Sequence, residues 1–286
     1  MLSYRHAFHA GNHADVLKHS ILVSVLEYYL RKDKPFWYID SHSGAGFYKL
    51  DSKFAAKNAE YKTGISKVLN KEGLPELLSS FQALVKEANA GKRSLTFYPG
   101  SPWFAAQMLR SSDKLRLHEL HPSDAKLLQE NMRNLVRKRA HIEVSDGFVG
   151  VKGVMPPPTK RAVVLIDPPY EDKKDYQKVA KLLKDSLLRF QNGTFAVWYP
   201  QLASIESREF PALLKKAVKQ AGVESWCHAT LSIKGMPKGK GMYGSGMFIV
   251  NPPYLLPEQL EKALPVMKEL MCDPLSGDFS LEFEGL

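Results

Sequence analysis

The sequence predicts an α/β fold of the Rossmann-like type, with a mainly parallel seven-stranded sheet, a last strand that runs antiparallel, and a small helical insertion. Short apolar runs typical of buried strands alternate with longer segments of helical periodicity. This is the pattern of a parallel sheet covered by helices on both faces. A glycine-rich turn follows the first of these runs, where such folds bind nucleotide-like ligands.

The first half of the pattern begins with a helix predicted over residues 12–32, in which Asn12 is placed to cap the first turn and apolar residues recur at helical spacing. A buried strand over residues 35–39 follows. It leads into Asp40-Ser41-His42-Ser43-Gly44-Ala45-Gly46, a loop whose glycines allow the backbone to approach a ligand closely.

The character of the chain changes between Asp51 and about Thr96, where a helix begins near Pro75 and stops near Gly91 without a strong strand signal around it. We therefore expect a main domain of residues 1–50 and 97–286 and a helical insertion subdomain of residues 51–96.

The α/β alternation then resumes, with strands predicted over residues 115–119, 142–144, 162–166 and 194–198 and helices over 102–110, 123–138 and 175–190. The last two predicted strands, 224–233 and 246–250, leave no room for a helix between them. We expect them to pair antiparallel across the loop 234–245.

Composition limits the class of protein and of partner. The chain has 286 residues, with 40 Lys and Arg against 30 Asp and Glu, so its net charge is +10. This charge favours a polyanionic partner, although a basic surface without a dedicated ligand is the simpler alternative. The apolar stretches are too short for a membrane span, two cysteines are too few for a disulfide framework, and the N-terminus lacks a signal-peptide pattern, so we expect a cytoplasmic protein.

The motif Asp167-Pro168-Pro169-Tyr170 follows the apolar run 162–166 and suits methyl transfer to an amino group conjugated to a flat ring. The nitrogen of such a group is a poor nucleophile, because its lone pair is delocalised. The Asp167 carboxylate and the Pro168 carbonyl can loosen that conjugation by accepting hydrogen bonds from the N–H groups, and we expect the Tyr170 ring to lie against the target base. The four residues alone are equally compatible with an ordinary turn.

Acidic residues close three successive predicted strands and decide which nucleotide-like cofactor fits. A dinucleotide fingerprint needs a third glycine at the position of Lys49. Asp40 instead suits the ammonium and cationic sulfur of S-adenosylmethionine, Glu119 its ribose hydroxyls and Asp146 its adenine amino group. Each acid alone is compatible with a helix cap or a solvated turn. Three acids at the ends of three successive strands, together with Asp167 at the end of the fourth, predict a methyltransferase dependent on S-adenosylmethionine.

A second motif of the same kind, Asn251-Pro252-Pro253-Tyr254, follows the last predicted strand. Because this strand should run antiparallel to the others, its end lies at the sheet edge opposite the cofactor crevice. We predict that Asn251–Tyr254 is a structural turn.

Several longer blocks resemble one known family. They are residues 1–19, the loop Asp40–Gly46, Tyr98–Pro102, Glu119–Ser123, Asp146-Gly147 and Asp167–Tyr170. In these blocks the chain resembles the bacterial 23S ribosomal RNA adenine-N6 methyltransferases of the RlmJ family.

The resemblance implies a monomeric Rossmann-type enzyme with a helical insertion that methylates one adenine of 23S rRNA, on protein-poor RNA during ribosome assembly. It also implies which residues contact S-adenosylmethionine: His19, His42, Ser101, Glu119, Asp146, Gly147 and Asp167. Asp167 would also be the catalytic acceptor, and Tyr4 would contact the RNA substrate.

Further RNA contacts are expected from Arg5 and His6 beside Tyr4 and from Lys238 and Lys240 in the glycine-rich loop 234–245. Several histidines lie among the first nineteen residues, but the cysteines are distant and only Asp15 supplies a carboxylate nearby. We therefore predict no metal site.

The expected reaction is a direct transfer, in which the adenine amino nitrogen attacks the sulfonium methyl in line while Asp167 orients the nitrogen and receives its proton. A DNA adenine-N6 methyltransferase shares this chemistry and stays open. A protein-glutamine N5 methyltransferase fits less well, because it normally carries Asn at the position of Asp167. A non-catalytic RNA-binding protein would require that S-adenosylmethionine does not bind.

Overall fold

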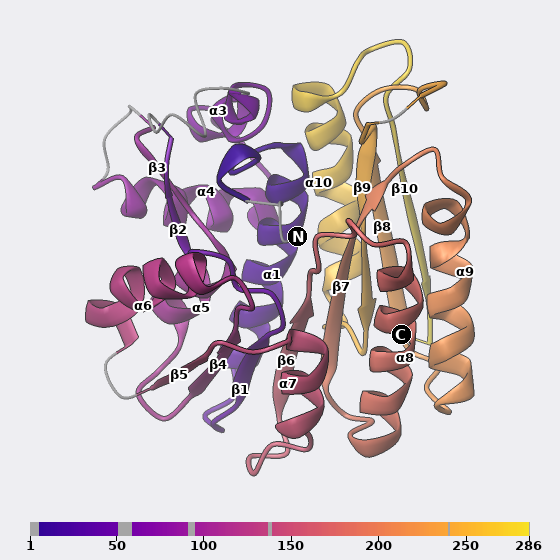
Figure 1. Ribbon diagram of the computed structural model, residues 1–286. Coiled ribbons are helices and arrows are strands. Elements are labelled where there is room, and N and C mark those ends of the chain that lie inside the picture. Colours follow the sequence, from indigo (N-terminus) through magenta and orange to yellow (C-terminus); the bar gives the residue numbers. More distant parts are fainter. Residues whose placement is uncertain (1–5, 51–58, 91–94, 137–138, 240, 286) are drawn as a thin grey trace.

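The computed structural model describes residues 6–50, 59–90, 95–136, 139–239 and 241–285 (Figure 1). Its centre is an eight-stranded sheet in the order β10-β8-β9-β7-β6-β1-β4-β5. The strands are β1 (Trp37–Asp40), β4 (Lys114–His118), β5 (Ala140–Glu143), β6 (Ala162–Ile166), β7 (Thr194–Gln201), β8 (Trp226–Ser232), β9 (Gly244–Val250) and β10 (Asp278–Glu284).

The direction of the strands confirms the predicted mainly parallel α/β fold. From β5 through β4, β1 and β6 to β7, every neighbouring pair is parallel. β9 then runs antiparallel to both β7 and β8, as predicted for the strand at 246–250.

The predicted number of seven strands is one too low, because β10 pairs antiparallel with β8 at the edge of the sheet. Three of the seven residues of β10 are acidic, and none of the seven is buried. An edge strand of this kind lacks the apolar run that marked the other strands.

Two groups of helices cover the sheet, and β6 shows how one strand serves both. Val163 and Leu165 pack on one face, whereas Ala162, Val164 and Ile166 pack on the other, as the two-residue period of a strand requires. The first face is covered by α1 (His13–Leu30), α4 (Glu76–Ala88), α5 (Ser101–Met108) and α10 (Leu256–Met271). The second is covered by α7 (Gly147–Gly153), α8 (Lys174–Arg189) and α9 (Ile205–Gln220), while α6 (Pro122–Val136) packs on α5 and β5.

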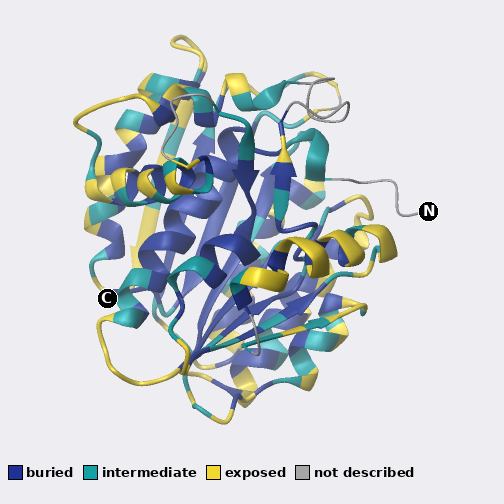
Figure 2. Cartoon of the chain, turned by 90° about the vertical axis from the view of Figure 1, so that its left-hand side faces the viewer, coloured by how far each residue is buried: buried dark blue, intermediate teal, exposed yellow. Residues whose placement is uncertain are grey.

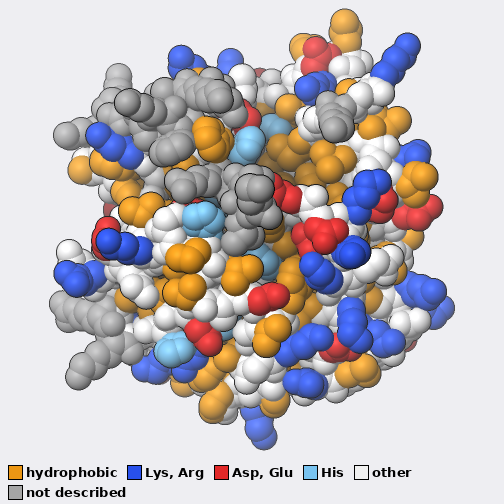
Figure 3. All heavy atoms as spheres, viewed as in Figure 1, with side chains coloured by type: hydrophobic (Ala, Val, Ile, Leu, Met, Phe, Trp, Pro, Cys, Tyr) orange, Lys and Arg blue, Asp and Glu red, His pale blue; other side chains and the backbone are white. Residues whose placement is uncertain are grey.

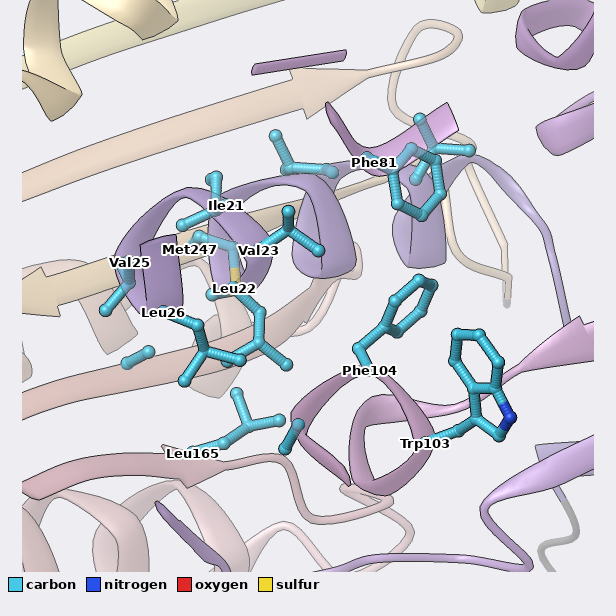
Figure 4. Close-up of a cluster of buried hydrophobic side chains, with 14 of the residues drawn as sticks. Ile21, Leu22, Val23, Val25, Leu26, Phe81, Trp103, Phe104, Leu165 and Met247 are labelled. Atoms are coloured by element: carbon cyan, nitrogen blue, oxygen red, sulfur yellow. The ribbon is translucent and has the colours of Figure 1, made fainter. Parts of the chain in front are cut away.

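Helix α1 is buried along nearly its whole length, because α4, α5, α10 and the sheet surround it. The Asn12 side chain caps it by accepting from the backbone N–H groups of Ala14 and Asp15. Figure 4 shows its apolar residues among side chains from α4, α5, β6 and β9. Figure 2 shows the same pattern for the whole chain, with buried residues in the sheet and exposed residues on the outer helix faces.

The segment predicted as a helical insertion lies between two short strands, β2 (Phe47–Lys49) and β3 (Phe97–Pro99), which pair antiparallel. Between them, η2 (Glu60–Lys62) and α3 (Ile65–Leu69) precede α4. Phe81 of α4 lies 5.6 Å from Phe104 of α5, measured between ring centroids, so α4 belongs to the same core as α1. The boundaries 51–96 of an insertion subdomain stay a prediction.

The second proline motif lies where it was predicted. Val250, the last residue of β9, is paired with Phe195 near the start of β7, so Asn251 lies at the edge opposite the carboxyl ends of the parallel strands. Its side-chain amide donates to the carbonyl oxygens of Gln191 (2.6 Å) and Gly193 (2.8 Å). The motif therefore acts as a turn that ties β9 to β7.

In the part of the chain that the structure describes, no helix is both long enough and apolar enough to pass through a bilayer.

Phe81→Ala should lower the free energy of unfolding of the whole chain by about 3–5 kcal/mol, because the ring is fully buried in the core shared with α1. Chemical denaturation followed by circular dichroism measures this change. Leu275→Ala, at a side chain that is 98% exposed, is the control and should change stability by less than about 0.5 kcal/mol. A separate early transition in Phe81→Ala, with the main transition unmoved, would contradict a shared core.

Candidate active site

A pocket of about 480 Å³ lies at the carboxyl ends of β1, β4, β5 and β6, a volume within the range of small-molecule sites. In Figure 3, acidic and histidine side chains lie near the middle of this face. Every residue that the family resemblance implied as a contact of S-adenosylmethionine lines this pocket: His19, His42, Ser101, Glu119, Asp146, Gly147 and Asp167. The structure thus brings these residues together, while their contacts with the cofactor stay a prediction.

Glu119 joins the loop after β1 to the loop after β4. One carboxylate oxygen accepts from the backbone N–H of Gly44 (2.8 Å) and the other from that of His121 (2.7 Å). Gly44 has a φ of +57°, a conformation that favours glycine. Burial raises the pKa of Glu119, and the two backbone donors oppose this shift.

Gly147 begins α7, directly after Asp146, whose side chain caps the helix by accepting from Phe148 N–H (2.8 Å). A Cβ atom at Gly147 would lie 1.8 Å from the carbonyl oxygen of Ser41. Only glycine therefore allows α7 to approach the first loop this closely. The approach places the Phe148 ring beside His42, with ring centroids 5.2 Å apart.

Asp40 closes β1 but does not line the pocket, so the predicted direct contact with the cofactor's ammonium is not supported. The side chain is fully buried and accepts from Tyr38 Oη and Ser101 Oγ, each at 2.7 Å. Burial raises the pKa of Asp40 to about 6, although these hydrogen bonds favour the ionised form. Asp40 orients Ser101, and Ser101 faces the pocket in its place.

Asp167 follows β6 and forms an ion pair that the sequence analysis missed. Lys18 Nζ of α1 lies 2.7 Å from Asp167 Oδ2 and 3.0 Å from Asp15 Oδ1, and the Lys18 side chain is only 5% exposed. Burial raises the pKa of Asp167, whereas Lys18 lowers it and favours the carboxylate. The available signal was two residues of opposite charge one turn apart, Asp15 and Lys18, in a predicted helix whose next residues are mostly apolar.

His19 lies beside this ion pair and bonds through Nδ1 to the hydroxyl of Tyr98 (2.7 Å). Burial lowers the pKa of His19 well below its usual value, so the ring is neutral at physiological pH.

The stacking role predicted for Tyr170 is not supported. Tyr170 has a φ of +51°, and its ring turns into the fold, where it is 6% exposed and packs against Tyr176 and Phe210. Its hydroxyl donates to the Trp198 carbonyl (2.7 Å). The left-handed backbone after the two prolines thus directs the ring away from the pocket, while Pro168 and Pro169 line it.

The residues predicted to contact RNA are placed only in part. His6 lines the pocket and bonds through Nε2 to Asp15 Oδ2 (2.9 Å). Lys238 is exposed on the β8–β9 loop; because Ser232, Gly244 and Gln201 are paired, this loop lies at the same sheet edge as the pocket. Tyr4, Arg5 and Lys240 lie outside the described residues. Among the residues that are described, no three His, Cys, Asp or Glu side chains are grouped to hold a metal ion.

Comparison with known proteins decides the family. A family model described as "Ribosomal RNA large subunit methyltransferase D, RlmJ" matches residues 33–284. The chain belongs to this family. Ribosomal RNA large subunit methyltransferase J of Haemophilus influenzae is 39% identical over 283 residues, 99% of each chain. Its namesake of Escherichia coli is 41% identical over 265 residues, 93% of this chain and 92% of the relative.

A solved structure supports the same conclusion for the fold. A crystal structure of a protein from Legionella pneumophila has a TM-score of 0.87 and 34% identity, covering 96% of this chain and 98% of that one. The predicted resemblance to the RlmJ family and the Rossmann-like methyltransferase fold are confirmed. The prediction of a ribosomal RNA methyltransferase is confirmed at the level of the family.

The raised pKa of Asp40 predicts a pH dependence of stability. An unfolded aspartate has a pKa of about 3.9, whereas folding raises the pKa of Asp40 to about 6. The fold therefore favours the protonated form: the contribution to stability is complete below about pH 4 and is lost as the pH rises through about 6, by ~2–3 kcal/mol. Asp40→Asn removes this titration, so the unfolding free energy of the native chain should fall relative to that of the variant between pH 4 and pH 7. Denaturant unfolding at each pH measures both free energies. A difference between the two proteins that stays constant from pH 4 to pH 7 would exclude a raised pKa of Asp40.

Proposed function

We propose that the protein transfers the methyl group of S-adenosylmethionine to N6 of a single adenine in 23S rRNA. The observation that carries this proposal is the common pocket, where the carboxylate of Asp167 lies among all the residues implied as cofactor contacts. We also propose that the substrate is protein-poor rRNA during ribosome assembly in the cytoplasm, and that the enzyme is a monomer.

The cofactor would lie across the carboxyl ends of β1, β4 and β5. Glu119 has both oxygens at the mouth of the first loop, where each can share a further hydrogen bond with a ribose hydroxyl. Asp146 and Phe148 flank the place proposed for the adenine ring, the first as an acceptor and the second as an apolar wall. Ser101 and His19 also line the pocket, and we propose that the methionine part would lie beside them and Asp167.

Catalysis would depend on the ion pair between Asp167 and Lys18. Lys18 is bonded to Oδ2, so Oδ1 is the oxygen proposed to accept from the adenine amino group, together with the Pro168 carbonyl. Burial raises the pKa of Asp167, and Lys18 opposes this rise, so Lys18 favours the ionised form that can accept a hydrogen bond. Attack of the amino nitrogen on the sulfonium methyl would form the N–C bond as the S–C bond breaks, so that neutral S-adenosylhomocysteine leaves. Asp167 would then receive the proton that the nitrogen loses.

The RNA would approach at the carboxyl edge of the sheet. The net charge of +10 favours a nucleic acid, and both named relatives are ribosomal RNA methyltransferases. Figure 3 shows Lys and Arg side chains over α7 and α8, beside the pocket. Lys238 lies at the same edge on the β8–β9 loop, and Tyr4, Arg5, His6 and Lys240 complete the proposed RNA contacts.

Asp167→Ala should lower the rate of methyl transfer by about 10²–10⁴-fold, the usual contribution of a positioned proton acceptor. Asp15 remains as a partner for Lys18, so the fold should persist. Transfer of labelled methyl to RNA measures the rate. Asp33→Ala, at a fully exposed aspartate, is the matched control and should be unaffected. Near-normal turnover by Asp167→Ala would exclude the proposed role.

The nature of the polymer separates the proposal from a DNA adenine methyltransferase. Purified 23S rRNA stripped of protein should accept labelled methyl at one adenine, whereas duplex DNA should accept none. Digestion of the product to nucleosides, followed by mass spectrometry, should show N6-methyladenosine. Labelling of duplex DNA instead of rRNA would establish the alternative.

A further inference from the structure

The segment between β2 and α4 contacts the turn that precedes α1, at one carboxylate. Glu60 of η2 places Oε1 3.0 Å from His9 Nδ1, and its Oε2 accepts from Asn12 Nδ2 at 2.9 Å. The Glu60 side chain is 32% exposed. The bond to Glu60 raises the pKa of His9, which favours a charged pair. One carboxylate thus holds two residues of the turn.

Asn12 connects Glu60 to the first turn of α1. Its side-chain oxygen caps α1 by accepting from Ala14 N–H and Asp15 N–H, both at 3.0 Å, while its amide nitrogen donates to Glu60. Glu60 therefore fixes the orientation of the amide that begins the helix.

The backbones of the two segments are also in close contact. Ile65 N–H donates to the carbonyl oxygen of Gly11 at 2.8 Å. A Cβ atom at Gly64 would lie 2.2 Å from that same oxygen. The approach is thus possible only because residue 64 has no side chain.

From this turn, a continuous series of polar contacts leads to Asp167. Gly11 N–H donates to Asp15 Oδ2 at 2.8 Å, and His6 Nε2 lies 2.9 Å from the same oxygen. Asp15 Oδ1 lies 3.0 Å from Lys18 Nζ, which lies 2.7 Å from Asp167 Oδ2. A displacement of this turn would move Gly11 N–H and His6, the two groups bonded to Asp15 Oδ2. Through Asp15 and Lys18 it would also move the carboxylate of Asp167.

We propose that Glu60 is a positioning residue for the active site: through Asn12 and His9 it holds the turn before α1, and this turn holds the Asp15–Lys18–Asp167 series and His6 at the pocket. The inference rests on the proposed methyl transfer at this pocket. It assigns to the segment between β2 and α4 the role of positioning the active-site residues. Glu60 is not among the residues that line the pocket.

The test compares Glu60→Ala with the matched control Glu72→Ala, at an exposed glutamate in the turn between α3 and α4. Hydrogen exchange measured by mass spectrometry should be faster over residues 6–15 in Glu60→Ala than in the native chain, and unchanged in Glu72→Ala. With stripped rRNA as substrate, kcat/KM for S-adenosylmethionine should fall roughly tenfold in Glu60→Ala, the equivalent of one lost hydrogen bond. The melting temperature should be similar in all three proteins, because Glu60 is partly exposed.

Glu60→Gln is the conservative variant, because its amide oxygen can accept from Asn12 and its amide nitrogen can donate to a neutral His9. It should restore most of the protection and most of kcat/KM. The inference is overturned if Glu60→Ala matches Glu72→Ala in exchange or in kinetics. A native chain that transfers no methyl to rRNA refutes the proposed function instead, and the exchange data then still show whether Glu60 holds the turn.

Discussion

The buried ion pair between Lys18 and Asp167 is the interaction on which the arrangement of the pocket depends. Removing two charges from water costs several kcal/mol per ion, and the cost is offset only when both ions keep well-placed partners. Lys18 has a second carboxylate in Asp15, which in turn accepts from Gly11 N–H and from His6. Helix α1 can therefore be buried on every side and still place the ammonium group of Lys18 at the end of β6.

The predictable part of the structure came from signals that are local in sequence. The apolar run 162–166 became β6 with the same bounds, and the helix, loop and strand that precede the insertion were each found within a few residues. Acids and glycines at strand ends met in one pocket, because the carboxyl ends of parallel strands share an edge. Residues far apart in sequence could be grouped by this rule without knowledge of the pairing.

The unpredicted part depends on side-chain direction and on partners that are remote in sequence. Asp40 was assigned to the ligand, but its Oδ2 accepts from Tyr38 and Ser101 and its Oδ1 from the backbone N–H of His42. Tyr170 was placed on the base, but the positive φ that follows the two prolines turns its ring inwards. Lys18 was missed because its partner Asp167 lies 149 positions away. The residue types of a motif do not contain this information.

The edge strand β10 has a consequence for the behaviour of the protein at high concentration. A free strand edge is a template on which a strand of another molecule can add. Here Asp278, Glu282 and Glu284 are each tied to side chains of the same chain, namely Lys268, Lys215 and Trp226. A strand that added to this edge would lie beside these carboxylates and would remove part of their hydration, which costs free energy. The charges that hid β10 from sequence analysis thus protect the sheet against aggregation.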